Sequence, residues 1–186
     1  MYRRIIKLTP FGSVGVIWSS IHSSVRITRV LLSKPGFSAE ERVNRLYPDS
    51  RNSSCMEIEA VATGIRAFLE GEDIVLPLDA LDLDRCPAFQ RAVLRAEHGI
   101  PWGSLSTYKL IAAHLGKPKG ARAVGNALAT NPFPLIVPCH RAIRSDGHLG
   151  GYQGGLEMKR ALLEREGIPL DASGRAVIKQ LHFAHD

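Results

Sequence analysis

The sequence of 186 residues has little cysteine, and this scarcity excludes two kinds of protein. The three cysteines, Cys55, Cys86 and Cys139, are an odd number and lie far apart in the chain. A disulfide framework needs paired cysteines, and a Cys-x-x-Cys metal motif needs two of them close together. Neither can be built from these residues, so we expect the chain to occupy a reducing compartment.

Long apolar runs are also missing. The N-terminus begins like a signal peptide, but Lys7, Pro10 and Gly12 interrupt its apolar part. No run approaches the roughly 18 apolar residues that cross a bilayer. We therefore expect a soluble cytoplasmic protein that does not associate with membranes.

Acidic residues are fewer than basic ones, 18 against 24, which gives a formal net charge of +6. A basic excess of this size is compatible with a polyanionic partner. The hydrophobic fraction of 45% is sufficient for a packed core. The length suits one large domain or one and a half small ones, and no internal repeat or low-complexity segment is evident.

The first 85 residues have the pattern of an α/β domain. Ser38-Ala-Glu-Glu41 resembles a capping box and predicts the start of a short helix. A longer helix is expected at 55–70, where apolar residues recur at helical spacing before Gly71. Runs rich in β-branched residues, separated by turn residues, predict antiparallel strands at 4–9, 14–18 and 25–32.

The segments that connect these elements suggest where the first domain ends. Residues 49–54 are predicted to form a polar loop and Ile74–Pro77 a short strand. Asp79–Arg85 resembles a linker. We therefore place the two domains at 1–85 and 86–186.

The second domain is predicted to be mostly helical. The tight turn Gly116–Gly120 separates two of its expected helices, and helix, turn and helix together have the outline of a helix-turn-helix. Turns of this kind are common, so the outline alone does not identify a DNA-binding protein. Helices are expected at 87–95, 107–115, 121–129 and 156–166.

The residues that can carry chemistry concentrate in one stretch, Asn131-Pro-Phe-Pro-Leu-Ile-Val-Pro-Cys-His-Arg141. Pro138 fixes its own φ and favours an extended conformation at Val137. Cys139 is therefore held on a stiff backbone, which suits a side chain whose reactive atom must be aimed at one place.

Cys139 has two interpretations. It is a buried structural cysteine, which is the commoner case, or it is a nucleophile with His140 and Arg141 beside it. Adjacent side chains of an extended chain point to opposite faces. His140 would therefore need a turn or a bridging water to act on the thiol.

His140 would also need a residue that orients it. In the helix at 156–166, Met158, Leu162 and Glu166 follow one another at i+4 spacing, so Glu166 is the acid expected to point inwards. It also stands at the helix C-terminus, where the macrodipole disfavours an anion without a partner. The alternative is a solvated glutamate of the last turn.

Two further segments are open to two interpretations each. The helix at 121–129 is rich in alanine and glycine, with Arg122 as its one long side chain. Such a surface allows close helix packing, or close approach to a nucleic-acid groove. The glycine-rich segment Gly147–Gly155 contains Tyr152 and suits a mobile connector or the wall of a ligand pocket.

These features together resemble the O6-alkylguanine-DNA alkyltransferases, also called methylated-DNA–protein-cysteine methyltransferases. Pro138-Cys-His-Arg141 is the active-site signature of that family. The resemblance extends from about Phe89 to Gly167 through 103–108, 121–125, 131–132 and 150–155. The first 80 or so residues share no specific motif with the family. They resemble its small α/β domain, whose sheet is RNase-H-like and mainly antiparallel, only in their general pattern.

The resemblance implies a direct, stoichiometric and irreversible DNA repair reaction. Cys139 accepts the alkyl group from O6-alkylguanine, His140 activates the thiol through a water, and Glu166 orients His140. Asn131 braces the turn before the active stretch. Tyr108 donates a hydrogen bond to the guanine ring as guanine leaves.

The resemblance also implies how the DNA is held. The recognition helix enters the minor groove of double-stranded DNA that contains O6-alkylguanine, and Arg122 replaces the extruded base. The residues expected to contact DNA are Arg122, Ala121, Ala123, Gly125, Ala127, Leu128 and Thr107. The residues expected to line the substrate pocket are Tyr108, Ala142, Gly150, Tyr152, Gln153 and Gly154.

No cofactor is expected, and a monomer is expected to suffice. Some family members bind zinc in the N-terminal domain, but here that half offers only Cys55 and His22, with Cys86 at the boundary, so we predict no structural zinc. Gln153 stands where a smaller serine is common in the family, and it bears on the size of alkyl group that fits.

The same residues are also compatible with two other functions. A DNA-binding module that senses lesions or regulates transcription would not need Cys139. A cysteine hydrolase using Cys139, His140 and Glu166 would turn over small esters or amides without DNA. The small-residue helix, Arg122 and the basic charge have no purpose in a hydrolase.

Overall fold

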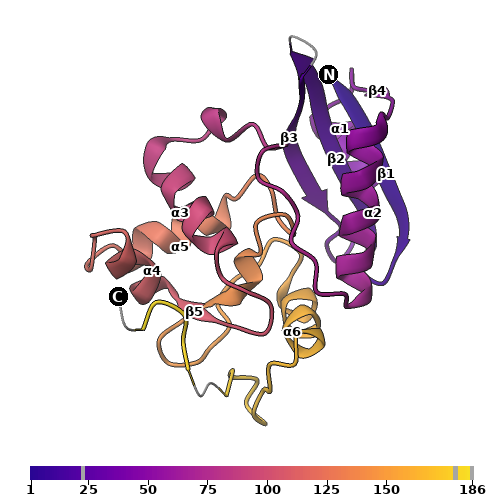
Figure 1. Ribbon diagram of the computed structural model, residues 1–186. Helices are drawn as coiled ribbons and strands as arrows, with labels where there is room; N and C mark the ends of the chain where they lie inside the picture. Colours follow the sequence, from indigo (N-terminus) through magenta and orange to yellow (C-terminus); the bar gives the residue numbers. More distant parts are fainter. Residues whose placement is uncertain (22–23, 178–179, 185–186) are drawn as a thin grey trace. The chain divides into compact units, whose positions relative to one another are not determined.

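The computed structural model describes residues 1–21, 24–177 and 180–184 (Figure 1). His22, which was considered above as a zinc ligand, lies outside the described residues. The chain forms two compact units. The first consists of Met1–Leu83 with Pro132–Ile136, and the second of Asp84–Asn131 with Val137–Asp186. The division of labour between a supporting and an active domain stays a prediction.

The first unit is built on a four-stranded sheet of order β3-β2-β1-β4. β1 (Tyr2–Thr9), β2 (Gly12–Ile21) and β3 (Ser24–Leu32) pair in an antiparallel manner, as predicted. The polar segment predicted as a loop contains β4 (Arg51–Asn52), which pairs with β1 in parallel and makes the sheet mixed. The sheet is therefore mainly, but not wholly, antiparallel.

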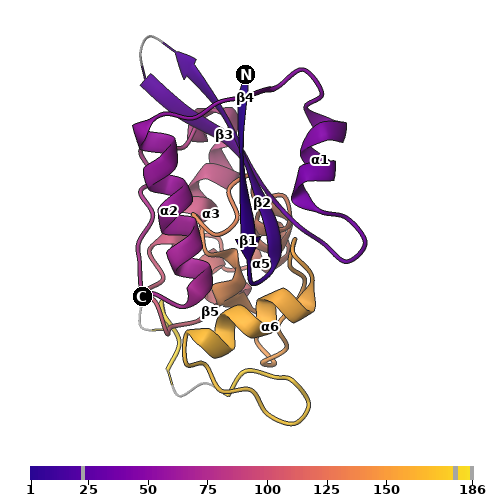
Figure 2. The same cartoon turned by 90° about the vertical axis from the view of Figure 1, so that its right-hand side faces the viewer.

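Helices cover both faces of this sheet (Figure 2). α1 (Ala39–Leu46) begins with the predicted capping box of Ser38 and Glu41, and its Val43 packs with Ile17 and Leu31. α2 (Met56–Glu70) lies on the other side and ends at Gly71, whose φ of 105° only glycine adopts readily.

The strand predicted at Ile74–Pro77 is wrong. That segment has no regular structure, and the contact with β3 comes slightly later, where the Ile27 N–H donates to the Ala80 carbonyl at 2.7 Å. Pro77 has no N–H for a ladder. The apolar character of the segment instead serves packing, because a Cβ at Gly64 would lie 2.6 Å from a Leu76 methyl.

The second unit is mostly helical, as predicted, with two very short parallel strands. β5 (Ser106–Thr107) pairs with β6 (Ala142–Ile143), and η2 (Cys139–Arg141) is a 3₁₀ turn of this unit. A second 3₁₀ turn, η1 (Leu83–Arg85), lies where the chain passes from the first unit to the second. Its helices are α3 (Ala88–His98), α4 (Tyr108–His114), α5 (Ala121–Ala129) and α6 (Leu156–Arg165).

α4 and α5 form the predicted helix-turn-helix. The Thr107 side chain caps α4 by accepting a hydrogen bond from the Leu110 N–H at 3.1 Å. The turn is so tight that a Cβ at Gly120 would lie only 2.9 Å from the Lys117 carbonyl oxygen. Gly120 is therefore required for α5 to begin at that point.

A small core anchors the segments around η2. It contains Leu105, which directly precedes β5, together with Ile143 of β6 and Leu163 of α6, all at most 1% exposed. β6 follows η2 directly in the chain, so fixing β6 in this core also fixes the turn that carries Cys139. Across the described ranges, no helix has the length and apolar character needed to cross a membrane.

Candidate active site

Cys139, His140 and Arg141 lie on the η2 turn and are all nearly or fully buried. The Arg141 N–H closes the turn by donating to the Pro138 carbonyl at 2.9 Å. A 3₁₀ turn therefore bends the chain at Cys139 and His140, where the sequence left a turn or a bridging water open. The two side chains are thus not held on opposite faces of an extended strand.

Glu166 points inwards and is the acceptor around which this turn is organised. His140 Nε2 and Glu166 Oε1 lie 2.7 Å apart. Arg141 Nε donates to Glu166 Oε2 at 2.9 Å, and Arg141 Nη2 donates to Oε1 at 3.0 Å. The Gly103 N–H donates to Oε2 at 3.3 Å. Glu166 is only 5% exposed, so the alternative of a solvated glutamate is excluded.

The protonation states of this cluster follow from its contacts. Burial alone would raise the pKa of Glu166, but the hydrogen bonds from His140 and Arg141 hold it below its usual value. Burial lowers the pKa of His140 despite the nearby carboxylate. His140 is therefore neutral with its proton on Nε2, facing Glu166, and Nδ1 is its basic nitrogen.

The Cys139 thiol rests protonated. Burial raises the pKa of Cys139 to about 12, although a hydrogen bond with the Asn131 side chain acts in the opposite direction. Asn131 is fully buried, and its Nδ2 also donates to the Val137 carbonyl at 3.2 Å. Asn131 thus touches both the thiol and the backbone that enters the turn. A reaction at Cys139 needs a base close by.

Tyr108 begins α4, and its hydroxyl lies against the glycine-rich segment. A Cβ at Gly150 would lie 2.7 Å from the Tyr108 hydroxyl oxygen, and Gly150 has a φ of 70°. Both facts require glycine at this position. Burial, with smaller contributions from Glu97 and Cys139, raises the pKa of Tyr108 to about 12, so the hydroxyl remains a hydrogen-bond donor.

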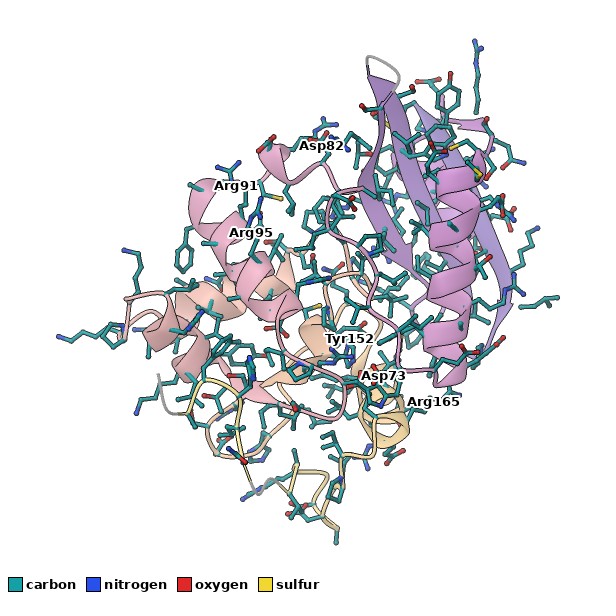
Figure 3. The ribbon with its side chains drawn as sticks, in the orientation of Figure 1. Asp73, Asp82, Arg91, Arg95, Tyr152 and Arg165 are labelled. Carbon is teal, nitrogen blue, oxygen red and sulfur yellow. The ribbon has the colours of Figure 1, made fainter. Side chains whose placement is uncertain are left out.

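The glycine-rich segment is held in place rather than loosely attached. Gln153 Nε2 donates to the Asn131 carbonyl at 2.6 Å, and the Tyr152 ring meets the His140 ring edge-on with centroids 6.1 Å apart. Tyr152 stands in the segment that precedes α6 (Figure 3). Gly154, which follows Gln153 in the chain, and Ala142, which follows Arg141, are both buried. Tyr152 therefore lies against the turn that carries Cys139, and Gln153 against the segment before it, while their role as a pocket wall stays a prediction.

The residues of α5 that were expected to contact DNA fall into two groups. Arg122 and Ala123 are exposed, and nothing lies within 4 Å of a Cβ built on Gly125. Ala127 and Leu128 are buried, 7% and 5% exposed. Their side chains pack inside the unit, so the expectation of direct DNA contact by their side chains is corrected to one of supporting the helix.

Thr107 is corrected in the same way. It is 4% exposed, and its hydroxyl is the N-cap of α4. Its side chain therefore fixes the start of the helix that carries Tyr108 and is not presented at the surface.

An open concavity of about 560 Å³ runs along the exposed side of α5. It connects α5 with Tyr108, and basic side chains from three segments line it. Its lining residues are Tyr108, Lys109, Ala121, Arg122, Gly125, Asn126, Arg144, Ser145 and Asp146. A polyanion seated here would meet Arg122, Lys109 and Arg144 together.

Four residues of the site escaped the sequence analysis. Arg141 was noticed as part of the motif, but not as a second donor to Glu166. Gln90 on α3 donates to the Ala127 carbonyl at 3.0 Å and so caps the end of α5. Lys159 and Glu97 are fully buried. Only complete burial marks the last two, and sequence spacing does not reveal which charged residues of an amphipathic helix face inwards.

A metal site finds no support in the part of the chain that the structure describes, since no group of three or more His, Cys, Asp or Glu is placed to hold an ion there. Because His22 lies outside that part, the absence of zinc stays a prediction.

Comparison with known proteins gives a consistent result. Residues 88–168 match a family model described as the DNA-binding domain of 6-O-methylguanine DNA methyltransferase. The chain is 40% identical over 162 residues to a methylated-DNA–protein-cysteine methyltransferase of Methanothermobacter thermautotrophicus, covering 87% of this chain and 84% of that protein. A Haemophilus influenzae protein of the same name is 45% identical over 96 residues, covering 52% of this chain and 54% of that protein.

Solved structures agree. The crystal structure of Mycobacterium tuberculosis OGT in complex with DNA is similar with a TM-score of 0.69 and 34% identity, covering 89% of this chain and 92% of that one. An O6-methylguanine-DNA methyltransferase structure from Pyrococcus kodakaraensis has a TM-score of 0.67 at 24% identity, which bears on the fold alone.

Proposed function

The chain belongs to the 6-O-methylguanine DNA methyltransferase family, and from this premise we propose that it repairs DNA by transferring the alkyl group of O6-alkylguanine to Cys139. Cys139 Sγ attacks the carbon attached to O6 in an in-line displacement. The C–O6 bond breaks, its electron pair goes to the guanine, and a thioether forms on the protein. No group of the site returns the alkyl group, so each molecule acts once.

His140 and Glu166 remove the thiol proton during this step. His140 Nδ1 accepts the proton from Cys139 through a water, and Nε2 keeps its hydrogen bond to Glu166 at 2.7 Å. Because the Glu166 carboxylate is ionised and buried, it stabilises the imidazolium that forms. Arg141 holds the carboxylate in one orientation through its paired hydrogen bonds.

Tyr108 assists the leaving group. Guanine departs with negative charge, and the protonated hydroxyl of Tyr108 donates a hydrogen bond to the ring as that charge develops. The wall formed by Gly150, Tyr152, Gln153 and Gly154 lies beside the base, and the backbone around Cys139 and Ala142 accepts hydrogen bonds from its amine.

The recognition helix delivers the base to this pocket. An O6-alkyl group cannot be reached inside a duplex, so the nucleotide must be flipped out. The small residues Ala121, Ala123 and Gly125 allow α5 to enter the minor groove closely, and Arg122 fills the place that the base leaves. The open side of α5 and its adjoining concavity support this role.

One observation carries the proposal: a buried cysteine follows Pro138 on a turn whose next residue contacts an inward-pointing glutamate, beside a helix-turn-helix. The test is the intact mass of the protein after incubation with an oligonucleotide duplex containing O6-methylguanine. We expect a gain of one methyl mass per molecule, located at Cys139 by peptide mapping and absent from Cys139→Ala.

Other outcomes would favour the rival functions. Tight binding of the lesion with no change in mass would support a sensing module. Turnover of small esters without DNA would support a hydrolase. Either result would overturn the proposal.

A further inference from the structure

Glu97 is a charged residue deep inside the second unit that the reaction above does not use. It belongs to α3, and its side chain is completely buried. Two other charged residues of this helix, Arg91 and Arg95, project from α3 in Figure 3. An acidic side chain on the apolar face of an amphipathic helix is costly unless it has a purpose or a partner.

The surroundings of Glu97 do not pair it in the ordinary way. Among the described residues, none donates a hydrogen bond of standard geometry to either carboxylate oxygen. The Ala142 N–H lies near enough to favour the charged form weakly. Burial dominates and raises the pKa of Glu97 to about 8.

Lys159 is the cation that attracts this carboxyl group most strongly. It comes from α6, is completely buried, and donates to the backbone carbonyls of Ala142 at 2.7 Å and Leu149. Burial lowers the pKa of Lys159 to about 8, against the attraction of Cys139 and Glu97. The Ala142 carbonyl fixes Lys159 directly beside the strand that follows η2.

Three further charged or titratable groups of the described residues interact with Glu97. Arg141 on η2 also attracts Glu97, but its guanidinium is already paired with Glu166. Tyr108 on α4 and Cys139 on η2 both lie near enough for the Glu97 charge to raise their pKa values. Arg122, the charged residue of α5, is exposed and outside this cluster.

We propose that Glu97 is a positioning residue for alkyl transfer, which acts on Cys139 by controlling whether the buried Lys159 charge is compensated. With a neutral Glu97 carboxyl group, the Lys159 cation is left to stabilise the thiolate that develops at Cys139. With an ionised Glu97, the two charges cancel and a second anion faces the thiol.

A role of Glu97 in alkyl transfer rests on the proposed function. The effect of Glu97 on the reactivity of the Cys139 thiol does not depend on that function. The reactivity of Cys139 should rise with pH less steeply than for an isolated thiol, because Glu97 loses its proton to solvent over the same range. Ionisation of Glu97 should also make the Tyr108 hydroxyl harder to deprotonate, because the Glu97 charge raises the pKa of that hydroxyl.

The test is the rate of Cys139 alkylation by iodoacetamide from pH 6.5 to pH 9, followed by peptide mass mapping, in wild type, Glu97→Gln and Glu97→Asp. Iodoacetamide needs no DNA, so the measurement is independent of whether the protein repairs alkylguanine. We expect Glu97→Gln to match wild type at pH 6.5 and to react about two to three times faster near pH 8, where part of Glu97 has lost its proton while part of Lys159 keeps its charge. At pH 9 Lys159 is mostly neutral, so its contribution to the difference should be lost there. Glu97→Asp keeps a carboxyl group and should retain the wild-type profile.

Two controls make the result decisive. Glu164→Gln removes an exposed carboxylate from α6 and should not change the profile. Lys159→Met should slow alkylation and remove most of the effect of Glu97→Gln in the double variant. A ratio of Glu97→Gln to wild type that does not vary with pH would overturn the proposal, as would an equal effect of Glu97→Gln with and without Lys159.

The same variants assayed with O6-methylguanine duplex separate the role of Glu97 from the proposed function. If methyl transfer never occurs in wild type, the proposed function fails while the thiol profile still decides the role of Glu97. If transfer occurs, its pH profile should change in Glu97→Gln in the same direction as the iodoacetamide profile.

Discussion

At the scale of single residues, the site depends on a carboxylate that serves two donors at once. Glu166 accepts from His140 and Arg141, and these contacts hold its pKa below the usual range in a buried place. Removing the Glu166 charge would therefore affect both His140, the proposed base, and Arg141, which orients the carboxylate. Glu166 stands at the C-terminus of α6, where the macrodipole disfavours an anion, and the hydrogen bonds from His140 and Arg141 compensate for that position.

Glu166→Gln should slow methyl transfer by about 100-fold or more at neutral pH, because general-base catalysis by His140 loses its stabilising anion. The rate should partly recover as pH rises and the thiol ionises unaided. Single-turnover transfer rates measured from pH 6 to pH 10 test this. A neutral-pH rate equal to wild type would rule out the relay. Glu164→Gln, on the exposed face of the same helix, is the matched control.

Gln153 is predicted to limit the size of the alkyl group through one hydrogen bond. Its amide donates to the Asn131 carbonyl at 2.6 Å and fastens the pocket wall to the segment that braces Cys139. Gln153→Ser removes this bond and side-chain volume. We expect transfer from O6-benzylguanine to increase relative to O6-methylguanine. An unchanged ratio of the two rates, measured by intact mass, would show that the bond does not restrict the pocket.

At the scale of elements, sequence patterns predicted local features and missed distant ones. The capping box at Ser38 and the turn at Gly116–Gly120 follow from neighbouring residues, and both were predicted correctly. The strand at Ile74–Pro77 was wrong because β pairing depends on a distant partner, and Ile27 pairs with residues 80–81 instead. Which charged residues are buried is equally non-local, so Glu97 and Lys159 were missed.

The sequence predicted the direction of one side chain of the site but not the backbone conformation at the cysteine. The i+4 spacing placed Glu166 inwards correctly, since it needs only the helix period. Pro138 was expected to favour an extended conformation at Val137, and the sequence left open whether the chain turns at Cys139. The hydrogen bond from the Arg141 N–H to the Pro138 carbonyl shows that it does. A proline restricts its own φ and the residue before it, and it leaves the conformation of the next residue open.

α5 is predicted to act through one exposed side chain. Arg122→Ala should reduce transfer from a duplex substrate by about tenfold or more, because flipping a base costs a few kcal/mol without a residue to fill its place. Binding to unmodified duplex should weaken less. Transfer rates on duplex and single-stranded oligonucleotides, with Arg95→Ala as a control on α3, test this. Equal losses on both substrates would contradict an intercalating role.

At the scale of the whole molecule, the reaction changes the protein permanently. Cys139 is 5% exposed, and its neighbours Val137, His140 and Ala142 are fully buried. An added methyl group has little room, and overpacking of this kind costs about 1–3 kcal/mol. The alkylated protein should therefore be less stable than the unreacted one.

Methylation of Cys139 should lower the melting temperature by several degrees, since each kcal/mol corresponds to about 2–4 °C in a chain of this size. Differential scanning calorimetry before and after complete reaction with O6-methylguanine duplex, with the DNA removed, measures the change. An unaltered melting temperature would mean that the pocket accommodates the methyl group without strain. Cys139→Ala treated in the same way is the control for handling.

The short segment Pro132–Ile136 belongs to the first unit, although it lies in the chain between two parts of the second. Its Pro132 carbonyl accepts a hydrogen bond from the Val30 N–H at 2.7 Å, and Phe133 is 1% exposed. The two units are therefore interleaved along the gene rather than joined end to end. Exchanging the first unit with that of a relative requires two DNA segments to be replaced together, since a single crossover near codon 84 would leave the incoming sheet with a foreign edge contact. Recombination between diverged relatives should accordingly succeed more often inside a unit than at the boundary between them.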